Sequence, residues 1–486
     1  MTVSNSEEPQ EVLFKKNLDH FYLIVKDQIL KFQYPISGLF PLNPKDPQCK
    51  FSHVRDSVYC ATVLWALHRA FVRVDDDAGR HYELGQCAVK CMRGILIGWM
   101  QQSSRPQQFK KTQSSETCLS SRLNYETGEP IVDPEYKNLQ MDCGSLYFIQ
   151  LAQMTASGLQ VVYTRDEVAF MQNLVFYLER AHRIPDYDMW ERGTKQNRNM
   201  VELNVSSIGM AKAALESVSG LNVYGAEGSH SSTLLMDIDA ADRNRIIMTN
   251  LLPREPASKG SDVSLLPALC WPAYGASKTE PSGPALERCL LRLKDQYGFR
   301  RFNRDGYVTV LDQNTHYQPG ELMKFTGIES EWPMFFAYMP IEHCMNGELE
   351  KAMEYDRVIQ PLLVHPVPER FPWLPKFLYV PLDDLERERK SRGSVVRKSS
   401  FHVPGESFFL WSQSVYIISQ LLIHGCLTPS DLDPLGRCPA WSSKLGALPH
   451  SSPIFVDKLL NLTIPQSSGH VSTCFLKVQA ALEALL

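Results

Sequence analysis

The sequence predicts an all-α fold, and three observations indicate it. Apolar residues recur at helical spacing through most of the chain. Segments that alternate apolar and polar residues are few and short. The loops between the helical patterns are long and rich in Pro, Gly, Asn and Asp, which end helices and form turns. This combination favours helices packed on helices, joined by irregular loops.

The expected helices follow one another along the chain. In residues 18–32, Phe21, Val25 and Phe32 lie at helical spacing, and Pro35 ends the pattern because proline disfavours helix in the residue before it. The next pattern, 57–74, is apolar almost all round, as expected for a helix buried between others. Further clear helical patterns lie at 83–100, 144–157, 166–183, 206–218, 285–297, 331–345 and 408–423. The short β-like pieces are 160–163, 233–237 and 377–380, each a candidate local hairpin.

Composition and charge argue against several classes of protein. Hydrophobic residues make up 44% and charged residues 21% of the 486 positions, which is typical of a soluble globular protein. The net charge of −4 gives no basic domain of the kind that binds nucleic acid. No run of about 18 apolar residues predicts a membrane span, and the polar N-terminus does not resemble a signal peptide. We therefore expect a cytoplasmic protein.

The 12 cysteines are spread singly through the chain. Cys87 and Cys91 share one face of an expected helix, but no CxxC pair occurs. Zinc sites use closely spaced cysteines, so this distribution predicts buried thiols, with no metal site and no cofactor.

Three segments depart from the helical pattern. Residues 1–16 are expected to be disordered. Residues 383–403 are charged and then basic, which predicts a solvated, mobile linker. Within it Arg397 and Lys398 precede Ser399 and Ser400, two candidate phosphorylation sites for a basophilic kinase. This stretch would attract an acidic partner such as calmodulin, although it lacks the apolar anchors of a calmodulin target helix. Residues 436–486 are rich in Ser, Pro, Gly and Leu and form an atypical C-terminal tail.

Several long, ordered motifs resemble a known family. The run at 158–193, GLQVVYTRDEVAFMQNLVFYLERAHRIPDYDMWERG, and the segment ELNVSSIGMAKAALE at 202–216 resemble the α and β regulatory subunits of phosphorylase kinase. The other matching motifs are SGLFP (37–41), VDDD (74–77), KCMRGIL (90–96), LLPRE (251–255), KDQYGFRRFNRDGY (294–307), IESEWPMFFAY (328–338) and FLWSQSVYIISQLL (409–422). The details lean toward the β subunit, although VRD at 54–56 is closer to the α pattern.

This resemblance implies a more specific fold. The regulatory subunits are similar to glucoamylase-type glycoside hydrolases over this region, so we expect a six-hairpin α/α toroid at residues 17–435. Our estimate of roughly eleven helices is near the twelve that such a toroid needs. The periodicity alone does not predict the toroid.

A glycosidase of this type would need two carboxyl groups on opposite sides of the scissile bond. By residue type, Glu191 is the best candidate for the acid, because the adjacent Trp190 would raise its pKa and stack on a sugar ring. The resemblance to glucoamylases places Glu191 on the general-acid motif. It also implies a sugar pocket, whose candidates are Arg55, Asp56, Gln140, Asp142, Trp190, Glu191 and Trp411.

The chain also departs from the hydrolase pattern. His53 replaces the usual tryptophan two residues before Arg55. Arg192 follows Glu191 where hydrolases carry another acid, and a cation there would favour the ionised carboxylate. The spacing of Glu406 from Trp411 does not match a catalytic base, so we assign none. A structural role remains open for each candidate, including an ion pair, a helix cap or a core aromatic.

Three functions therefore remain open. No GxGxxG loop, HRD loop or DFG motif occurs, so the chain is not itself a kinase. The resemblance implies a non-catalytic regulatory subunit in glycogen breakdown, bound to the catalytic γ subunit, the other large subunit and calmodulin. The alternatives are a glycoside hydrolase and a glycan-binding domain, both acting on α-glucans. Family members carry a C-terminal prenylation signal, but Glu483 stands where its cysteine would be, so no prenyl anchor is expected.

Overall fold

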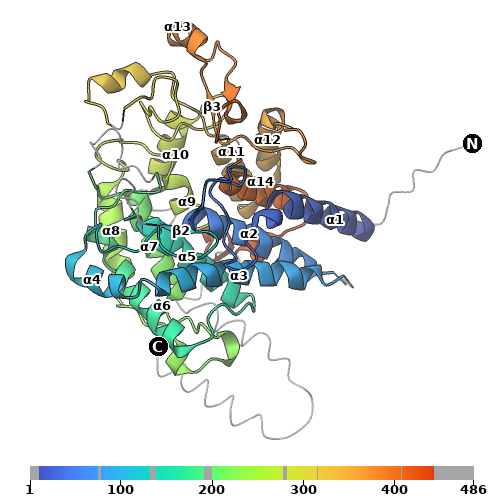
Figure 1. The fold of residues 1–486 in the computed structure, drawn as a ribbon, viewed down its shortest axis with the longest axis vertical. Helices are drawn as coiled ribbons and strands as arrows, with labels where there is room; N and C mark the ends of the chain where they lie inside the picture. The colour runs from blue at the N-terminus through green and yellow to red at the C-terminus, as the bar shows by residue number, and fades with distance from the viewer. Residues whose placement is uncertain are drawn as a thin grey trace, which may run out of the picture. The chain divides into compact units, whose positions relative to one another are not determined.

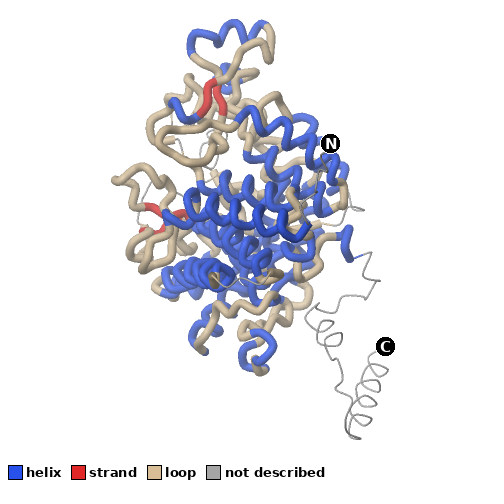
Figure 2. Tube along the Cα trace, turned by 90° about the vertical axis from the view of Figure 1, so that its right-hand side faces the viewer, coloured by secondary structure: helices blue, strands red, loops and turns tan. Residues whose placement is uncertain are grey.

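The computed structural model describes residues 10–74, 78–131, 138–190, 200–276, 282–314, 316–406 and 408–442. Helices dominate these residues, and the strands are few and short (Figures 1 and 2). None of the described helices is both long enough and apolar enough to pass through a lipid bilayer.

Six of the described helices form a closed inner ring. In chain order each contacts the next, and the last contacts the first. The ring consists of α2 (Val54–Phe71), α5 (Met141–Ala156), α7 (Val205–Val218), α9 (Leu265–Leu269), α11 (Met334–Met345) and α14 (Leu410–Ile423). In α2 every residue except Arg69 is buried, because neighbouring helices cover all of its sides. This explains why the sequence of α2 is apolar almost all round.

An outer helix packs against each inner helix. Five outer helices follow their inner partners directly in the chain: α3 (Arg80–Met100), α6 (Arg165–Leu178), α8 (Ala240–Leu251), α10 (Ser282–Leu293) and α12 (Leu349–Ile359). The sixth outer helix is α1 (Gln10–Gln28), which packs against α14 and α2. The shorter α4 (Ser104–Thr112) lies on α6. This alternation confirms the predicted α/α toroid of six hairpins.

Local sequence features set where some helices begin and how closely they approach. Thr164 and Glu167 form a capping box at the start of α6, in which each side chain accepts from the other's backbone N–H. On α3, Gly94 lies so close to the preceding loop that an added Cβ would be 2.1 Å from the carbonyl oxygen of Ser37. Only glycine allows that approach.

The described residues also form two small antiparallel sheets. β1 (Phe51–His53) pairs with β2 (Arg122–Asn124), and β3 (Leu378–Tyr379) pairs with β4 (Lys398–Ser399). The expected β piece at 377–380 therefore forms a strand. The piece at 160–163 does not, and at 233–237 only Thr233 forms an isolated bridge, with Asn222.

The predicted non-helical segments differ from the structure in two places. α1 begins at Gln10, so residues 10–16 of the segment expected to be disordered are helical. Residues 383–403 contain α13 (Leu385–Lys390) and β4, and the side chains of Glu388 and Arg397 are buried. The interpretation as a solvated linker was wrong for Glu388 and Arg397, because charged side chains that pair inside a protein look solvated in the sequence. Residues 443–486 of the predicted tail lie outside the described part of the chain.

Candidate functional site

The N-terminal ends of the inner helices meet at one end of the ring, which we call the mouth. Side chains from neighbouring ends touch there: Arg55 of α2 contacts Asp142 of α5 and Trp411 of α14. Asp186 joins the start of α5 to the start of α7 by accepting from Met141 N at 3.0 Å and Ser207 Oγ at 2.7 Å. The toroid therefore brings together residues that are far apart in the sequence.

Arg55 and Asp142 form a buried ion pair. Arg55 Nε lies 2.7 Å from Asp142 Oδ2, and both residues are almost fully buried. The guanidinium carbon lies 5.3 Å from the centre of the Trp411 ring, within the range of a cation–π contact. Two predicted sugar-pocket residues thus bind each other directly.

His53 connects the starts of α2 and α5. Its Nδ1 accepts from Arg55 N at 3.2 Å, and its Nε2 lies 3.1 Å from Gln140 Oε1. An imidazole that accepts at Nδ1 carries its proton at Nε2, so His53 is neutral here and donates to Gln140. The residue that replaces the usual tryptophan of hydrolases therefore caps α2 and holds another candidate pocket residue.

Asp56 lies in the same part of the mouth, near Lys376. Burial lowers the pKa of Lys376. The nearby Tyr307, Glu406 and Asp56 together raise this pKa by more, so its net shift is upward. Glu406 forms an ion pair with Lys376 and stays partly exposed. The carboxylate of Glu406 therefore already has a cationic partner in the protein.

Trp411 is a core aromatic in this structure. Its ring stacks on Tyr59 with centroids 5.2 Å apart and planes 14° apart. Its Nε1 donates to Tyr338 Oη at 2.9 Å. Because Trp411 is nearly fully buried and its polar atom is paired, it has a structural role that the sequence left open.

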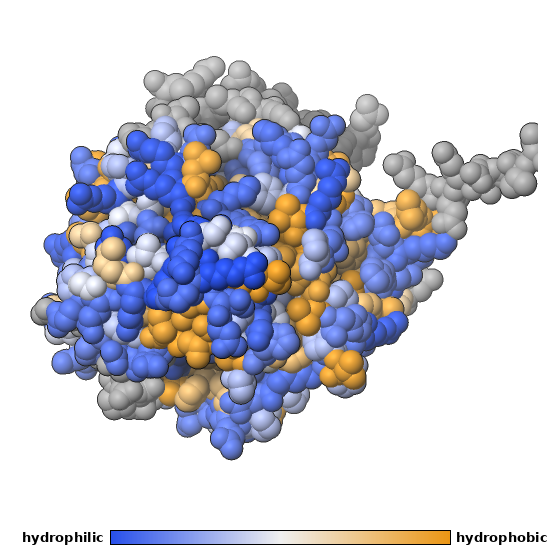
Figure 3. All heavy atoms as spheres, turned by 90° about the horizontal axis from the view of Figure 1, so that it is seen from above, coloured by the Kyte–Doolittle hydropathy of each residue, from blue (hydrophilic) through white to orange (hydrophobic). Residues whose placement is uncertain are grey.

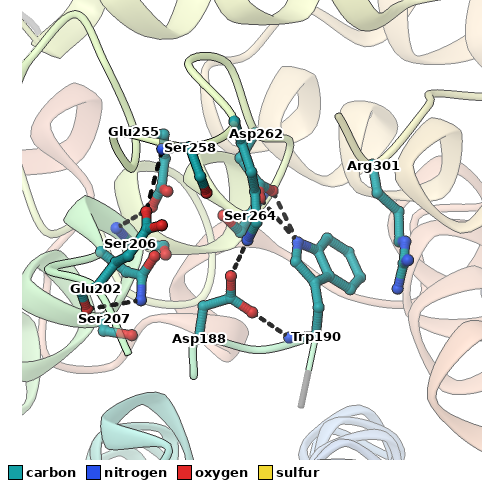
Figure 4. Close-up of polar contacts among 12 residues, drawn as sticks. Asp188, Trp190, Glu202, Ser206, Ser207, Glu255, Ser258, Asp262, Ser264 and Arg301 are labelled. Carbon is teal, nitrogen blue, oxygen red and sulfur yellow. Dashed lines mark hydrogen bonds and ion pairs between the residues drawn. The ribbon is translucent and has the colours of Figure 1, made fainter. Parts of the chain in front are cut away.

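Trp190 is fixed at both its backbone and its indole (Figure 4). Its backbone N donates to Asp188, and its Nε1 donates to both carboxylate oxygens of Asp262, at 2.9 and 3.0 Å. The guanidinium of Arg301 lies 4.9 Å from the Trp190 ring and binds both oxygens of Asp305. Glu191 and Arg192, which follow Trp190, lie outside the described residues.

A buried lysine gathers three carboxyl groups beside Trp190. Lys259 pairs with Asp188 and, at 3.0 Å, with Asp262. Glu255 accepts from Ser206 N at 2.6 Å. Burial raises the pKa of Asp188 to about 7 and that of Glu255 to about 8. We call Asp188, Glu255, Lys259 and Asp262 the Lys259 cluster.

The Lys259 cluster was not predicted from the sequence. Glu255 belongs to the LLPRE motif, but its role was not apparent because charges 71 positions apart, such as Asp188 and Lys259, show no pairing in a single sequence. Among the described residues, no group of three His, Cys, Asp or Glu side chains is arranged to hold a metal ion.

The candidate phosphorylation sites lie in different environments. Ser399 is partly exposed, whereas Ser400 is fully buried and its Oγ accepts from Lys376 N at 3.1 Å. A kinase could reach Ser400 only after β4 separates from its neighbours.

A small cavity lies beside Gln140. Its volume is about 20 Å³, enough for a water molecule and too small for a sugar ring. The residues that line it include Trp99, Ser121, Cys143 and Tyr177. Gln140 Nε2 has no hydrogen-bond partner among the described residues, so a water in this cavity would satisfy it.

A closed ring of inner helices with charged and aromatic side chains at its mouth is the architecture of the glucoamylase-type toroids. The chain belongs to the family described as Glycosyl hydrolases family 15, which it matches over residues 15–452. A wild-type glycosidase superposes with a TM-score of 0.57 at 16% identity, covering 87% of this chain and 100% of that chain. A variant glycosidase in complex with glucose superposes with a TM-score of 0.56, also at 16% identity and with the same coverage. At these identities the likeness shows the fold alone.

The curated relatives are regulatory subunits. The chain is 45% identical over 425 residues to the probable phosphorylase b kinase regulatory subunit beta of Drosophila melanogaster, covering 87% of this chain and 37% of the relative. It is 40% identical to the probable alpha subunit of the same organism and 38% identical to the alpha subunit, liver isoform, of Takifugu rubripes; each match covers 86% of this chain and 34% of the relative. These matches confirm the predicted resemblance and its lean toward the β subunit. The chain spans about a third of the length of these relatives.

Proposed function

We propose that this chain is a non-catalytic regulatory subunit of a phosphorylase b kinase complex and controls glycogen breakdown. The observation that carries the proposal is the 45% identity to a regulatory subunit across 87% of the chain. In this role it binds the catalytic γ subunit, the other large regulatory subunit and calmodulin in the cytoplasm.

The chemistry of the mouth supports the absence of catalysis. Hydrolysis of a glycosidic bond needs one protonated carboxyl group and one carboxylate that can activate water. Glu406, the nearest candidate for the second group, already forms an ion pair with Lys376. Arg55 and Asp142 bind each other, so two charged residues of the expected sugar pocket already have partners in the protein.

Affinity purification tests the regulatory role. The tagged chain is recovered from its native cells, and the proteins that accompany it are identified by mass spectrometry, with the tag alone as the control. We expect a phosphorylase kinase catalytic subunit and calmodulin in the sample with the chain and neither with the tag. Recovery of neither from the chain would refute the proposal.

The family membership supplies a second candidate, a hydrolase of α-glucans. Its test is glucose release from maltooligosaccharides by the purified chain, with Glu191→Gln as the matched control. We expect equal background release from both proteins. Release by the native chain that Glu191→Gln abolishes would overturn the non-catalytic role. Saturable maltooligosaccharide binding without release would instead support the glycan-binding alternative.

A further inference from the structure

A surface outside the mouth carries features that the proposed function does not use. The hairpin from β3 to β4 contains α13 and extends beyond the helical ring (Figures 1 and 2). We call residues 385–398 the α13 hairpin. Figure 3 views the molecule from this end, where hydrophilic side chains surround separate hydrophobic patches.

The base of the α13 hairpin is anchored in the body of the protein. Arg397 Nε pairs with Glu331 Oε1 at 2.8 Å, and both residues are buried. Leu385 and Val395 pack with Ile328 and Val380 in a small hydrophobic cluster. The hairpin therefore has a defined position on the protein.

The tip is held by one buried carboxylate. Glu388 accepts from Gly393 N at 2.9 Å and from Val395 N at 3.2 Å, and it lies 3.7 Å from Arg397 Nη2. Gly393 has a φ of +76°, which allows the tight turn. Burying a charged group is costly unless hydrogen bonds and an ion pair compensate it. A loop that only needs to be soluble does not require a buried charge. The Glu388 contacts instead keep the tip in one conformation.

The tip displays basic side chains on a chain whose net charge is −4. Arg387, Arg389, Lys390, Arg392 and Lys398 are all exposed. Arg389 pairs with Glu386, and Arg392 pairs with Asp295. Among the described residues, Arg387, Lys390 and Lys398 have no acidic partner within ion-pair distance.

Stabilisation of a helix end explains only part of this charge. Basic residues in the last turn of α13 interact favourably with its C-terminus. Arg392 and Lys398 lie beyond the helix, where that effect has faded. Val396 is also 79% exposed next to them, an apolar side chain among cations.

We propose that the α13 hairpin is a docking surface for an acidic segment of a partner protein, with an apolar residue of that segment on Val396. Charge complementarity selects the partner and speeds its encounter with the hairpin. The rigid tip lowers the conformational entropy lost on binding. The inference goes beyond the proposed function and does not depend on which assembly the chain joins.

The test uses the full chain and two labelled peptides of equal length and charge. One peptide alternates Glu with Leu, and the other alternates Glu with Gly. Fluorescence anisotropy gives each Kd at low and at high salt. We expect tighter binding of the Glu/Leu peptide, weakened at least about tenfold by R387E/K390E/K398E and weakened further by added salt.

A matched variant separates this surface from general attraction of polyanions. K15E/K111E/R183E reverses three other exposed basic residues and should leave the Kd within about twofold. Val396→Ser should raise the Kd of the Glu/Leu peptide and leave the Kd of the Glu/Gly peptide unchanged. Thermal melting checks that each variant is folded, and R387A/K390A/K398A replaces the charge reversal if that variant does not fold.

Three results would overturn the inference. Equal loss of binding in both charge-reversed variants would show nonspecific electrostatic attraction to the whole protein and no specific site at the α13 hairpin. Tighter binding of a single-stranded oligonucleotide of the same charge, lost in R387E/K390E/K398E, would assign the surface to nucleic acid instead. Retention of the Glu/Leu peptide by R387E/K390E/K398E would also exclude the α13 hairpin.

Discussion

Replacing Arg55 by methionine tests whether the Arg55–Asp142 ion pair at the mouth stabilises the fold or whether Arg55 lies in an open sugar pocket. Arg55 and Asp142 are buried to 2% and 3% exposure, with Nε and Oδ2 2.7 Å apart. Removing one member of such a pair leaves the other charge buried without compensation, which costs about 3–5 kcal/mol. Arg55→Met should therefore destabilise the fold strongly.

The expected size of the effect follows from the length of the toroid. For a domain of more than 400 residues, a loss of 1 kcal/mol lowers Tm by roughly 1 °C, so Arg55→Met should lower Tm by about 3–5 °C. Arg55→Met/Asp142→Leu should recover part of the loss, because no unpaired charge remains. Thermal unfolding followed by circular dichroism measures all three proteins.

Arg69→Met is the matched control on the same helix. Arg69 is partly exposed and lies 3.9 Å from Asp431, so its loss should cost less than about 1 kcal/mol. The reasoning would be refuted if Arg55→Met melted like the native chain while abolishing maltooligosaccharide binding. That result would mean that Arg55 faces a ligand and contributes little to the fold.

Three further perturbations have defined outcomes. Burial raises the pKa of Glu255 to about 8, well above its unfolded value of about 4.3, so its stabilising contribution is lost as the pH rises toward 8. Glu255→Gln should therefore show a smaller fall in Tm than the native chain between pH 6 and pH 8. Gly94→Ala should lose about 1–3 kcal/mol of unfolding free energy in urea, because its Cβ would lie 2.1 Å from Ser37 O. Glu388→Ala should speed tryptic cleavage after Lys390 and Arg392 at least about tenfold, since the turn loses the carboxylate that holds it.

Each of these predictions has a result that contradicts it. If Tm fell as much for Glu255→Gln as for the native chain between pH 6 and pH 8, Glu255 would not be the group that titrates in this range. Gly144→Ala is the control for Gly94→Ala, because its Cβ meets Leu178 at an ordinary 3.6 Å, and equal losses would exclude close approach as the cause. Glu386→Ala removes an exposed acid of the same helix, and equally fast cleavage would show that burial of Glu388 is irrelevant.

Helices with a clear apolar pattern were predictable from the sequence. α2 and α14 are buried on nearly all sides, so their apolar runs are long enough to recognise. α4, α8 and α12 were not predicted, because they lie on the outside and expose much of their polar surface. Closure of the ring came from the resemblance, since no local pattern records which helices meet.

The mouth was predictable only in part. The motif positions placed Arg55 and Asp142 in one pocket, and the structure brings them together. Their mutual ion pair was not expected, because a sequence does not show whether two charges 87 positions apart bind a ligand or each other. The Lys259 cluster could not be predicted for the same reason.

The way the ring closes has a consequence for synthesis of the chain. The α1 residue Gln28 bonds to Gln413 of α14 at 2.6 Å, across 385 positions. At ribosomal rates of about 5–20 residues per second, roughly 20–80 s pass between the synthesis of α1 and the synthesis of α14. Until then α2 can already cover part of the apolar face of α1, but the part that packs against α14 has no permanent cover. Nascent chains are therefore exposed to aggregation, and chaperones that hold α1 would raise the yield of folded protein.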